Sequence, residues 1–102
     1  MKLQILHVPD CPNVARLQAR LNEVLVGPHA VEVSRRELRT LAEAAAAGMT
    51  GSPTLLVDGT DPFRMPDQQP SLSCRLYRDP SGRVDGSPSQ ADLQKVLGLR
   101  DG

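Results

Sequence analysis

The sequence predicts an α/β fold whose elements follow one another in the order βαβαββα. Short β-rich runs alternate with segments in which apolar residues recur at spacings of three and four, and turns containing proline or glycine separate them. At 102 residues, the chain is long enough to bury one modest core. We therefore expect residues 1–102 to form a single domain.

Charge and composition argue against several classes of function. Twelve basic side chains balance twelve acidic ones, so no net charge attracts nucleic acid or an anionic membrane. Phe63 and Tyr77 are the only aromatic residues, too few for a base-stacking platform. The start MKLQILHVPDC is too short and too interrupted for a signal peptide or a membrane span. We expect a cytoplasmic protein, in which cysteines are more often reduced or catalytic than bridged.

The first strand and the first helix are the clearest local predictions. The apolar run over Lys2–Val8 is typical of a buried strand, and Pro9-Asp10 ends it. An amphipathic helix is predicted from Pro12 to about Val26, closed by Gly27-Pro28, with proline tolerated in its first turn. Its expected buried residues are Val14, Leu17, Leu21, Val24 and Leu25.

A second strand and a second helix are predicted next. Residues 30–33 carry a short alternating strand pattern. Ser34 and Glu37 have the spacing of a capping box, which predicts a helix over residues 35–47 that stops at Gly48. The expected buried stripe of this helix is Leu38, Leu41, Ala42 and Ala45.

The following segment is predicted to contain a third strand, a long loop and a fourth strand. Thr50–Pro53 is a turn, and Thr54–Val57 is rich in β-forming residues. Residues 59–73 contain three prolines and little apolar content, which indicates an exposed loop. A fourth strand is predicted over Cys74–Arg78, with Leu76 facing inward.

The chain is predicted to end in a hairpin and a helix. Asp79–Gly82 has the composition of a tight turn, and residues 83–86 extend the hairpin. Ser89 is the expected cap of the last helix, before a flexible tail over residues 98–102. Its expected inward-facing residues are Leu93, Val96 and Leu97.

Two motifs resemble the thioredoxin-fold superfamily. Cys11-Pro12-Asn13-Val14 follows the first strand, where the superfamily carries C-x-x-C, and Gly51-Ser52-Pro53-Thr54 leads into the third strand, where it has a cis-proline loop. The resemblance covers residues 2–97 and implies a four-stranded mixed sheet flanked by helices. Because Val14 replaces the resolving cysteine, the chain looks like a monothiol or degenerate thioredoxin- or glutaredoxin-like protein.

Two further segments are similar to small thioredoxin-like proteins labelled alkylmercury-lyase-related. These are SPTLLVDG at residues 52–59 and SLSCRLY at residues 71–77. Likeness at the level of the fold does not transfer organomercurial chemistry.

Cys11 is the candidate catalytic residue. Unpaired N–H groups and the positive dipole end of the following helix stabilise a thiolate there, which favours a nucleophilic sulfur. Asp10 opposes this effect with its negative charge, whereas His7, four residues earlier, is a candidate auxiliary residue. The alternative interpretation makes Cys11 a small apolar filler in a fold that has lost its activity.

The resemblance assigns substrate binding to Pro12, Ser52, Pro53 and Thr54. It implies that Pro53 is cis and lies against the reactive sulfur, while the Ser52 backbone offers strand-like hydrogen bonds to a peptide or to a glutathione-like thiol. The alternative interpretation makes Pro53 an ordinary turn proline.

Cys74 is a second candidate auxiliary residue. If strand three runs away from Cys11 and strand four returns, Cys74 lies at the far end of the sheet. A disulfide requires Cα atoms within about 7 Å, so this topology predicts a core or edge thiol. Arg75 and Arg78 are expected to be surface cations that could meet an anionic thiol substrate.

These observations favour a monothiol redox protein that uses Cys11 in thiol–disulfide exchange. Its partner would be a small thiol or a protein disulfide, with glutathione or another low-molecular-weight thiol as co-substrate, no bound cofactor, and a monomeric or weakly dimeric state. A catalytically inactive binding module stays open. So does soft-metal or mercury handling, although Cys11 alone is a poor metal site, since closed thiolate sites need several ligands.

Overall fold

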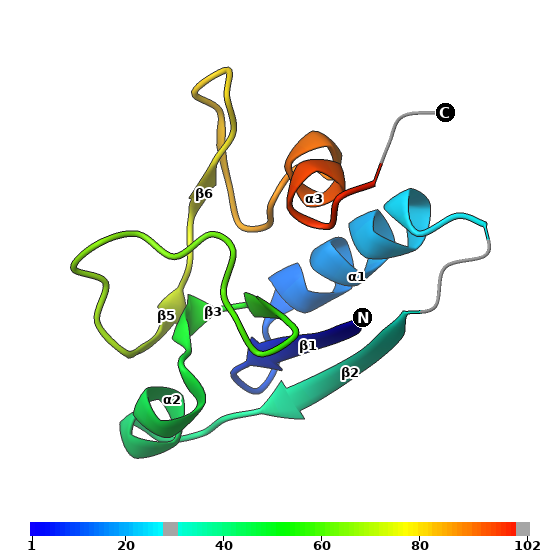
Figure 1. The fold of residues 1–102 in the computed structure, drawn as a ribbon. Helices are drawn as coiled ribbons and strands as arrows, with labels where there is room; N and C mark the ends of the chain where they lie inside the picture. The colour runs from blue at the N-terminus through cyan, green and yellow to red at the C-terminus, as the bar shows by residue number, and fades with distance from the viewer. Residues whose placement is uncertain (28–30, 100–102) are drawn as a thin grey trace.

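The computed structural model describes residues 1–27 and 31–99 as an α/β fold built on a three-stranded mixed sheet (Figure 1). The elements follow in the order β1 (Lys2–His7), α1 (Pro12–Val24), β2 (Glu32–Glu37), α2 (Leu41–Ala47), β3 (Thr50–Ser52), β4 (Thr54–Val57), β5 (Ser71–Cys74), β6 (Tyr77–Arg78), β7 (Val84–Asp85) and α3 (Gln90–Val96). β1 is the central strand, parallel to β2 and antiparallel to β4. None of the helices among the described residues is long and apolar enough to cross a membrane.

Two apolar clusters pack on opposite faces of this sheet. Because neighbouring side chains on a strand alternate between faces, Leu3 and Ile5 pack on one side of β1 and Leu6 on the other. The first cluster adds residues of β4, α1 and α3, namely Leu55, Val14, Leu17, Leu21, Val24, Leu93 and Leu97. The second adds Leu38, Ala44, Met49 and Leu56. In Figure 1, α1 and α3 lie together on one side of β1, and α2 lies on the other.

The predicted start of the second helix is wrong. Ser34 and Glu37 belong to β2, which pairs with β1 along its whole length up to His7–Glu37. The helix begins six residues later, where Thr40 Oγ1 accepts a hydrogen bond from Glu43 N and a Glu43 carboxylate oxygen accepts one from Arg39 N. Pairing with the central strand therefore overrides a local capping signal.

The predicted buried stripe of this helix is also largely wrong. Leu38 is buried, but it precedes α2 in the chain, and Leu41 is 57% exposed. Ala42 and Ala45 are exposed, whereas Ala44 is the buried residue of α2. Gly48 ends the helix in the left-handed region, at φ +86°, as predicted. Ala30, where the second strand was expected to start, lies outside the described residues.

The predicted fourth strand is not part of the central sheet. β5 instead pairs in parallel with β3, and Tyr77–Arg78 forms a separate two-stranded hairpin with β7. Gly51 permits the close approach of β5, since a Cβ atom there would lie 2.8 Å from Arg75 Cβ. Leu76, predicted to face inward, is 69% exposed, while its neighbours Arg75 and Tyr77 are buried.

The region predicted as an exposed loop is partly structured. Residues 71–73 belong to β5, the Asp61 side chain is only 6% exposed, and Phe63 packs against the larger core cluster. In the expected C-terminal tail, Leu99 also packs against that cluster. The loop and the tail are therefore anchored at these points by burial.

The local predictions at the two ends of the chain are confirmed. Pro12 begins α1, and Ser89 Oγ accepts a hydrogen bond from Asp92 N at the start of α3. The Asp79–Gly82 turn closes through a hydrogen bond from Gly82 N to the Asp79 carbonyl at 2.9 Å.

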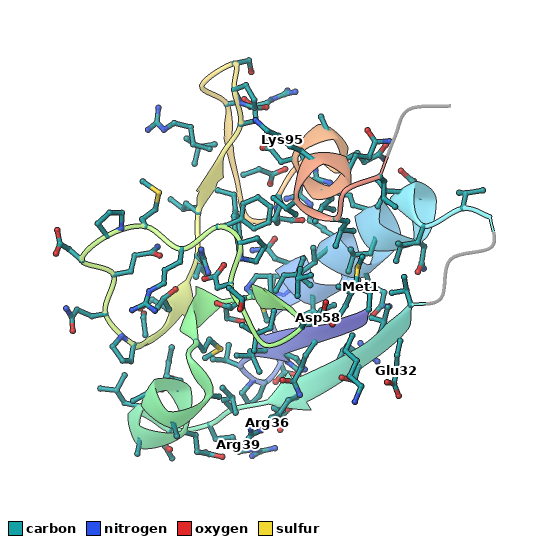
Figure 2. The ribbon with its side chains drawn as sticks, in the orientation of Figure 1. Met1, Glu32, Arg36, Arg39, Asp58 and Lys95 are labelled. Carbon is teal, nitrogen blue, oxygen red and sulfur yellow. The ribbon has the colours of Figure 1, made fainter. Side chains whose placement is uncertain are left out.

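β2 forms the outer edge of the central sheet, and all six of its residues are exposed. Figure 2 shows Glu32 and Arg36 on this edge and Arg39 just beyond it, pointing away from the ribbon. Charged side chains on an edge strand oppose pairing with another chain, so this composition suits an edge that faces water.

Candidate functional site

Cys11 lies at the start of α1, immediately after the turn that follows the central strand. Asp10 occupies the left-handed region at φ +58°, a conformation that aspartate tolerates, and Cys11 is the N-cap residue. The Cys11 side chain accepts no capping hydrogen bond, is partly buried and packs against the larger core cluster. Both Cys11 and Cys74 are free thiols. The fold thus presents an unbonded sulfur at a helix N-terminus.

The Ser52–Pro53 turn lies beside the end of β1, and its peptide bond is cis. Ser52 Oγ accepts a hydrogen bond from Val8 N at 3.0 Å, which connects this turn to the segment leading into Cys11. The Ser52 carbonyl accepts a second bond, from Arg75 N at 3.0 Å. Ser52, Pro53 and Thr54 are all buried. The edge of Ser52 that was expected to bind a substrate is therefore occupied by the chain itself.

Tyr77 contacts the Ser52–Pro53 turn through its hydroxyl group. Its hydroxyl donates a hydrogen bond of 2.5 Å to the Pro53 carbonyl. Phe63 packs edge-on against the Tyr77 ring with centroids 5.5 Å apart, and the Arg75 guanidinium lies 4.7 Å from the ring centroid. Burial raises the pKa of the Tyr77 phenol above its ordinary value, so the hydroxyl stays protonated and able to donate.

Arg75 forms a buried ion pair with Asp61, so the interpretation of Arg75 as a surface cation is wrong. Their charged atoms lie 2.7 Å apart, and the side chains are 3% and 6% exposed. Arg75 also donates to the Phe63 carbonyl at 2.7 Å and to Thr54 Oγ1 at 3.2 Å. Arg78, by contrast, is exposed as predicted. A buried guanidinium needs such partners, and here Asp61 and Phe63 come from the loop that follows β4 and Thr54 from β4 itself.

The segment after β5 returns to the start of α1. Gly86 packs so closely on Asn13 that a Cβ atom at Gly86 would lie 2.3 Å from the Asn13 amide nitrogen. Asp85 accepts hydrogen bonds from the guanidinium groups of Arg16 and Arg20, both at 2.8 Å. The bond from Arg20 is the main cause that lowers the pKa of the Asp85 carboxyl. These contacts fix β7 against the helix that Cys11 begins.

Cys74 does not lie at the far end of the sheet. That expectation assumed that Cys74 begins a strand antiparallel to Thr54–Val57. Cys74 instead ends β5, which runs parallel to β3 and pairs Cys74 with Ser52. Cys74 is exposed. The pairing brings it to the same turn that connects, through Ser52 Oγ, to the segment preceding Cys11.

His7 is oriented by its own backbone neighbour. Its Nδ1 lies 2.9 Å from the Val8 carbonyl, and because a carbonyl only accepts, this bond requires the proton on Nδ1. This hydrogen bond therefore holds the His7 ring against the backbone of the next residue. Nowhere in residues 1–27 or 31–99 do three or more histidine, cysteine or acidic side chains gather as a metal site would require.

Sequence reasoning missed Asp61, Arg75 and Tyr77. A strand pattern over residues 74–78 predicts that Leu76 faces away from Arg75 and Tyr77, and the structure agrees. We expected Leu76 to be the buried residue because it is apolar, but Arg75 and Tyr77 are buried instead. The scarcity of aromatic residues was the available signal, since Phe63 and Tyr77, the only two in the chain, pack against each other.

Comparisons of the chain with protein-family models, with curated proteins and with solved structures find no match.

Proposed function

We propose that this protein has a thioredoxin-like fold and carries out thiol–disulfide exchange with Cys11 as the attacking thiol. The observation that carries the proposal is the position of Cys11 as N-cap of α1, at the end of a segment that is bonded to the Ser52–Pro53 turn. The hydrogen bond from Val8 N to Ser52 Oγ ties these two segments together.

The proposed reaction is a direct displacement at sulfur. The Cys11 thiolate attacks a mixed disulfide, forms a new disulfide with one half and releases the other half as a thiolate. The attacking sulfur belongs to the N-cap residue of α1 and accepts no capping hydrogen bond. Val14 is buried in the core and has no thiol, so it cannot release the bound half. A second thiol, such as glutathione in a reducing cytoplasm, must complete the cycle.

Small disulfides suit this site better than extended peptides. A peptide that adds to the sheet at Ser52 needs free backbone groups there. The Ser52 carbonyl already accepts a hydrogen bond from Arg75 N, and β5 pairs with β3. We therefore propose mixed disulfides of low-molecular-weight thiols as the preferred substrates.

Turnover of a glutathione–cysteine mixed disulfide by the full chain tests this proposal. We expect Cys11→Ser to reduce the rate to that of uncatalysed exchange, because the attacking sulfur is removed. Cys74→Ser is the matched control, since it also removes one thiol, and we expect it to retain exchange when excess glutathione is supplied. Full activity in Cys11→Ser would overturn the proposal.

A binding module is the second candidate function. The observation that favours it is the burial of Ser52, Pro53 and Thr54, the residues expected to bind the substrate of an exchange reaction. In that case Cys11→Ser would leave partner binding unchanged. A soft-metal function would instead need Cys11 and Cys74 together as thiolate ligands, and loss of either thiol would then reduce metal retention.

A further inference from the structure

We propose that Cys74 is the resolving thiol for Cys11, so that the two form a reversible disulfide within one chain. This inference rests on the proposed exchange activity of Cys11 and replaces the external resolving thiol with an internal one. It is carried by the position of β5, which pairs Cys74 with Ser52, the residue whose hydroxyl is bonded to the segment leading into Cys11.

The pairing of β5 provides the first argument. Cys74 is the register partner of Ser52, the residue before Pro53, and the next residue donates its N–H to the Ser52 carbonyl. On the opposite side of Ser52, its hydroxyl accepts the hydrogen bond from Val8 N. Val8 is three residues before Cys11. Cys74 thus lies on the backbone edge of Ser52, and Ser52 is bonded to the segment that leads into Cys11.

The path of the chain after Cys74 provides the second argument. Three residues later, the Tyr77 hydroxyl binds the Pro53 carbonyl. The segment then closes against Asn13, two residues after Cys11, through the tight contact at Gly86. Residues 74–86 therefore run from the Ser52–Pro53 turn to the first turn of the helix that Cys11 begins.

The accessibility of the two thiols agrees with different roles. Cys74 is exposed and Cys11 is partly buried, and neither is bridged. A bond between them requires their Cα atoms within about 7 Å. β5 has only four residues, and its register with β3 is irregular between Thr50 and Ser52. The proposed bond therefore requires β5 and the start of α1 to come within this distance, which the experiment below tests.

The sequence of steps balances in electrons and protons. A small-molecule disulfide, RSSR, is the oxidant, and the Cys11 thiolate attacks it to give Cys11–S–S–R and one RS⁻. Cys74 loses its proton to water and attacks the Cys11 sulfur, which gives the Cys11–Cys74 disulfide and a second RS⁻. The net result is reduction of one disulfide to two thiolates and oxidation of the cysteine pair by two electrons.

The test incubates the reduced full chain with oxidised glutathione and follows intact mass and cysteine-containing peptides by mass spectrometry. In the native protein we expect a glutathione adduct on Cys11 that is transient, followed by a peptide pair linked through Cys11 and Cys74. In Cys74→Ser the adduct should persist, and in Cys11→Ser the native link should be absent. The yield of linked peptides should not depend on protein concentration, since the bond lies within one chain.

Two results would overturn the inference, and they are distinguishable. If the Cys11 adduct persists equally in the native protein and in Cys74→Ser, exchange at Cys11 stands but Cys74 does not resolve it. If no adduct forms on Cys11 in any folded variant, the proposed function itself fails, and the resolving role fails with it. Far-UV circular dichroism establishes that each variant is folded.

Discussion

Two buried polar side chains, Arg75 and Tyr77, hold the segment after β5 against the Ser52–Pro53 turn. Tyr77 donates to the Pro53 carbonyl, and Arg75 bonds Thr54 Oγ1 while pairing with Asp61. Removing one partner from such a contact leaves the other polar group buried without a hydrogen bond, which lowers the stability of the fold. These residues therefore stabilise the Ser52–Pro53 turn.

Tyr77 gives a direct spectroscopic test, because it is the only tyrosine and the chain has no tryptophan. Its folded pKa is raised, so the folded state holds the phenolic proton more tightly than the unfolded state does. We expect no rise in phenolate absorbance near 295 nm as the folded protein passes pH 10, but a full rise in urea. The stability contributed by the neutral phenol is present below the unfolded pKa and decreases as pH rises above it. Ionisation at pH 10 with the fold intact would contradict the buried contact.

Arg75 and Arg78 form a matched pair for the second prediction. Both are arginines of the same short segment, but Arg75 is buried with Asp61 whereas Arg78 is exposed. We expect Arg75→Met to lower the free energy of unfolding by about 3–5 kcal/mol, because the Asp61 charge is left buried without its partner. Arg78→Met should change it by less than about 0.5 kcal/mol. Urea unfolding followed by circular dichroism measures both, and equal effects would refute the burial of Arg75.

Two capping signals compete between β2 and α2. Ser34 with Glu37 and Thr40 with Glu43 have the same spacing, but only Thr40 caps a helix, because the first pair is part of β2. The choice depends on pairing with β1, which is distant in sequence. The local sequence pattern therefore could not predict which of the two signals begins the helix.

The third prediction separates these two signals by substitution. Thr40→Ala removes the acceptor for Glu43 N, so we expect a loss of about 1 kcal/mol in the free energy of unfolding. Ser34→Ala, at an exposed position of β2, should change it by less than about 0.5 kcal/mol. Thermal and urea unfolding provide the comparison. A larger loss of stability in Ser34→Ala than in Thr40→Ala would instead indicate that the helix begins near Ser34.

Elements set by local sequence were predictable, and elements set by distant pairing were not. β1, α1, β4 and α3 carry their own periodicity, caps and turn residues, and each lies close to its expected place. The parallel pairing of β5 with β3 depends on contacts between segments about twenty residues apart. No period or turn residue specifies that partner, so an antiparallel hairpin was the default expectation.

The same limit applies to the candidate site. Cys11 and Pro53 could be proposed from the sequence because each belongs to a short motif next to a strand. Cys74 was assigned to the wrong end of the sheet, since its position follows from the topology of β5. The Arg75–Asp61 pair was missed because a charged residue in an apolar segment is exposed unless a partner is buried with it.

At the scale of the whole molecule, Asp85 joins the C-terminal hairpin to α1 through Arg16 and Arg20. The pKa of Asp85 is lowered from 3.8, chiefly by the hydrogen bond from Arg20. A lowered folded pKa gives stability that is present above the unfolded pKa and lost as pH falls through the folded value.

The fourth prediction is that the protein loses stability below about pH 4, where the unfolded state takes up protons more readily. Asp85→Asn should lower stability at pH 7 and reduce this acid dependence. Asp79→Asn is the matched control: the pKa of Asp79 is also lowered, but by the Ser81 hydroxyl within the same turn. We expect Asp79→Asn to reduce the acid dependence of stability. It should leave the hairpin attached to α1, so hydrogen exchange in α1 should not increase. If hydrogen exchange in α1 is the same in Asp85→Asn as in the native protein, Asp85 does not connect the hairpin to α1.

The alkylation rate of Cys11 relative to Cys74 in the native protein tests the central claim most directly. Mass spectrometry after brief iodoacetamide treatment at pH 7 resolves the two sites, with the urea-unfolded chain as reference. Cys11 is the less exposed thiol, so burial alone predicts that it reacts more slowly than Cys74. We predict that Cys11 reacts faster than Cys74 and faster than it does in urea, because the proposed role as attacking thiol requires a nucleophilic sulfur in the folded protein. A Cys11 that reacts no faster than in the unfolded chain would contradict its role as the attacking thiol.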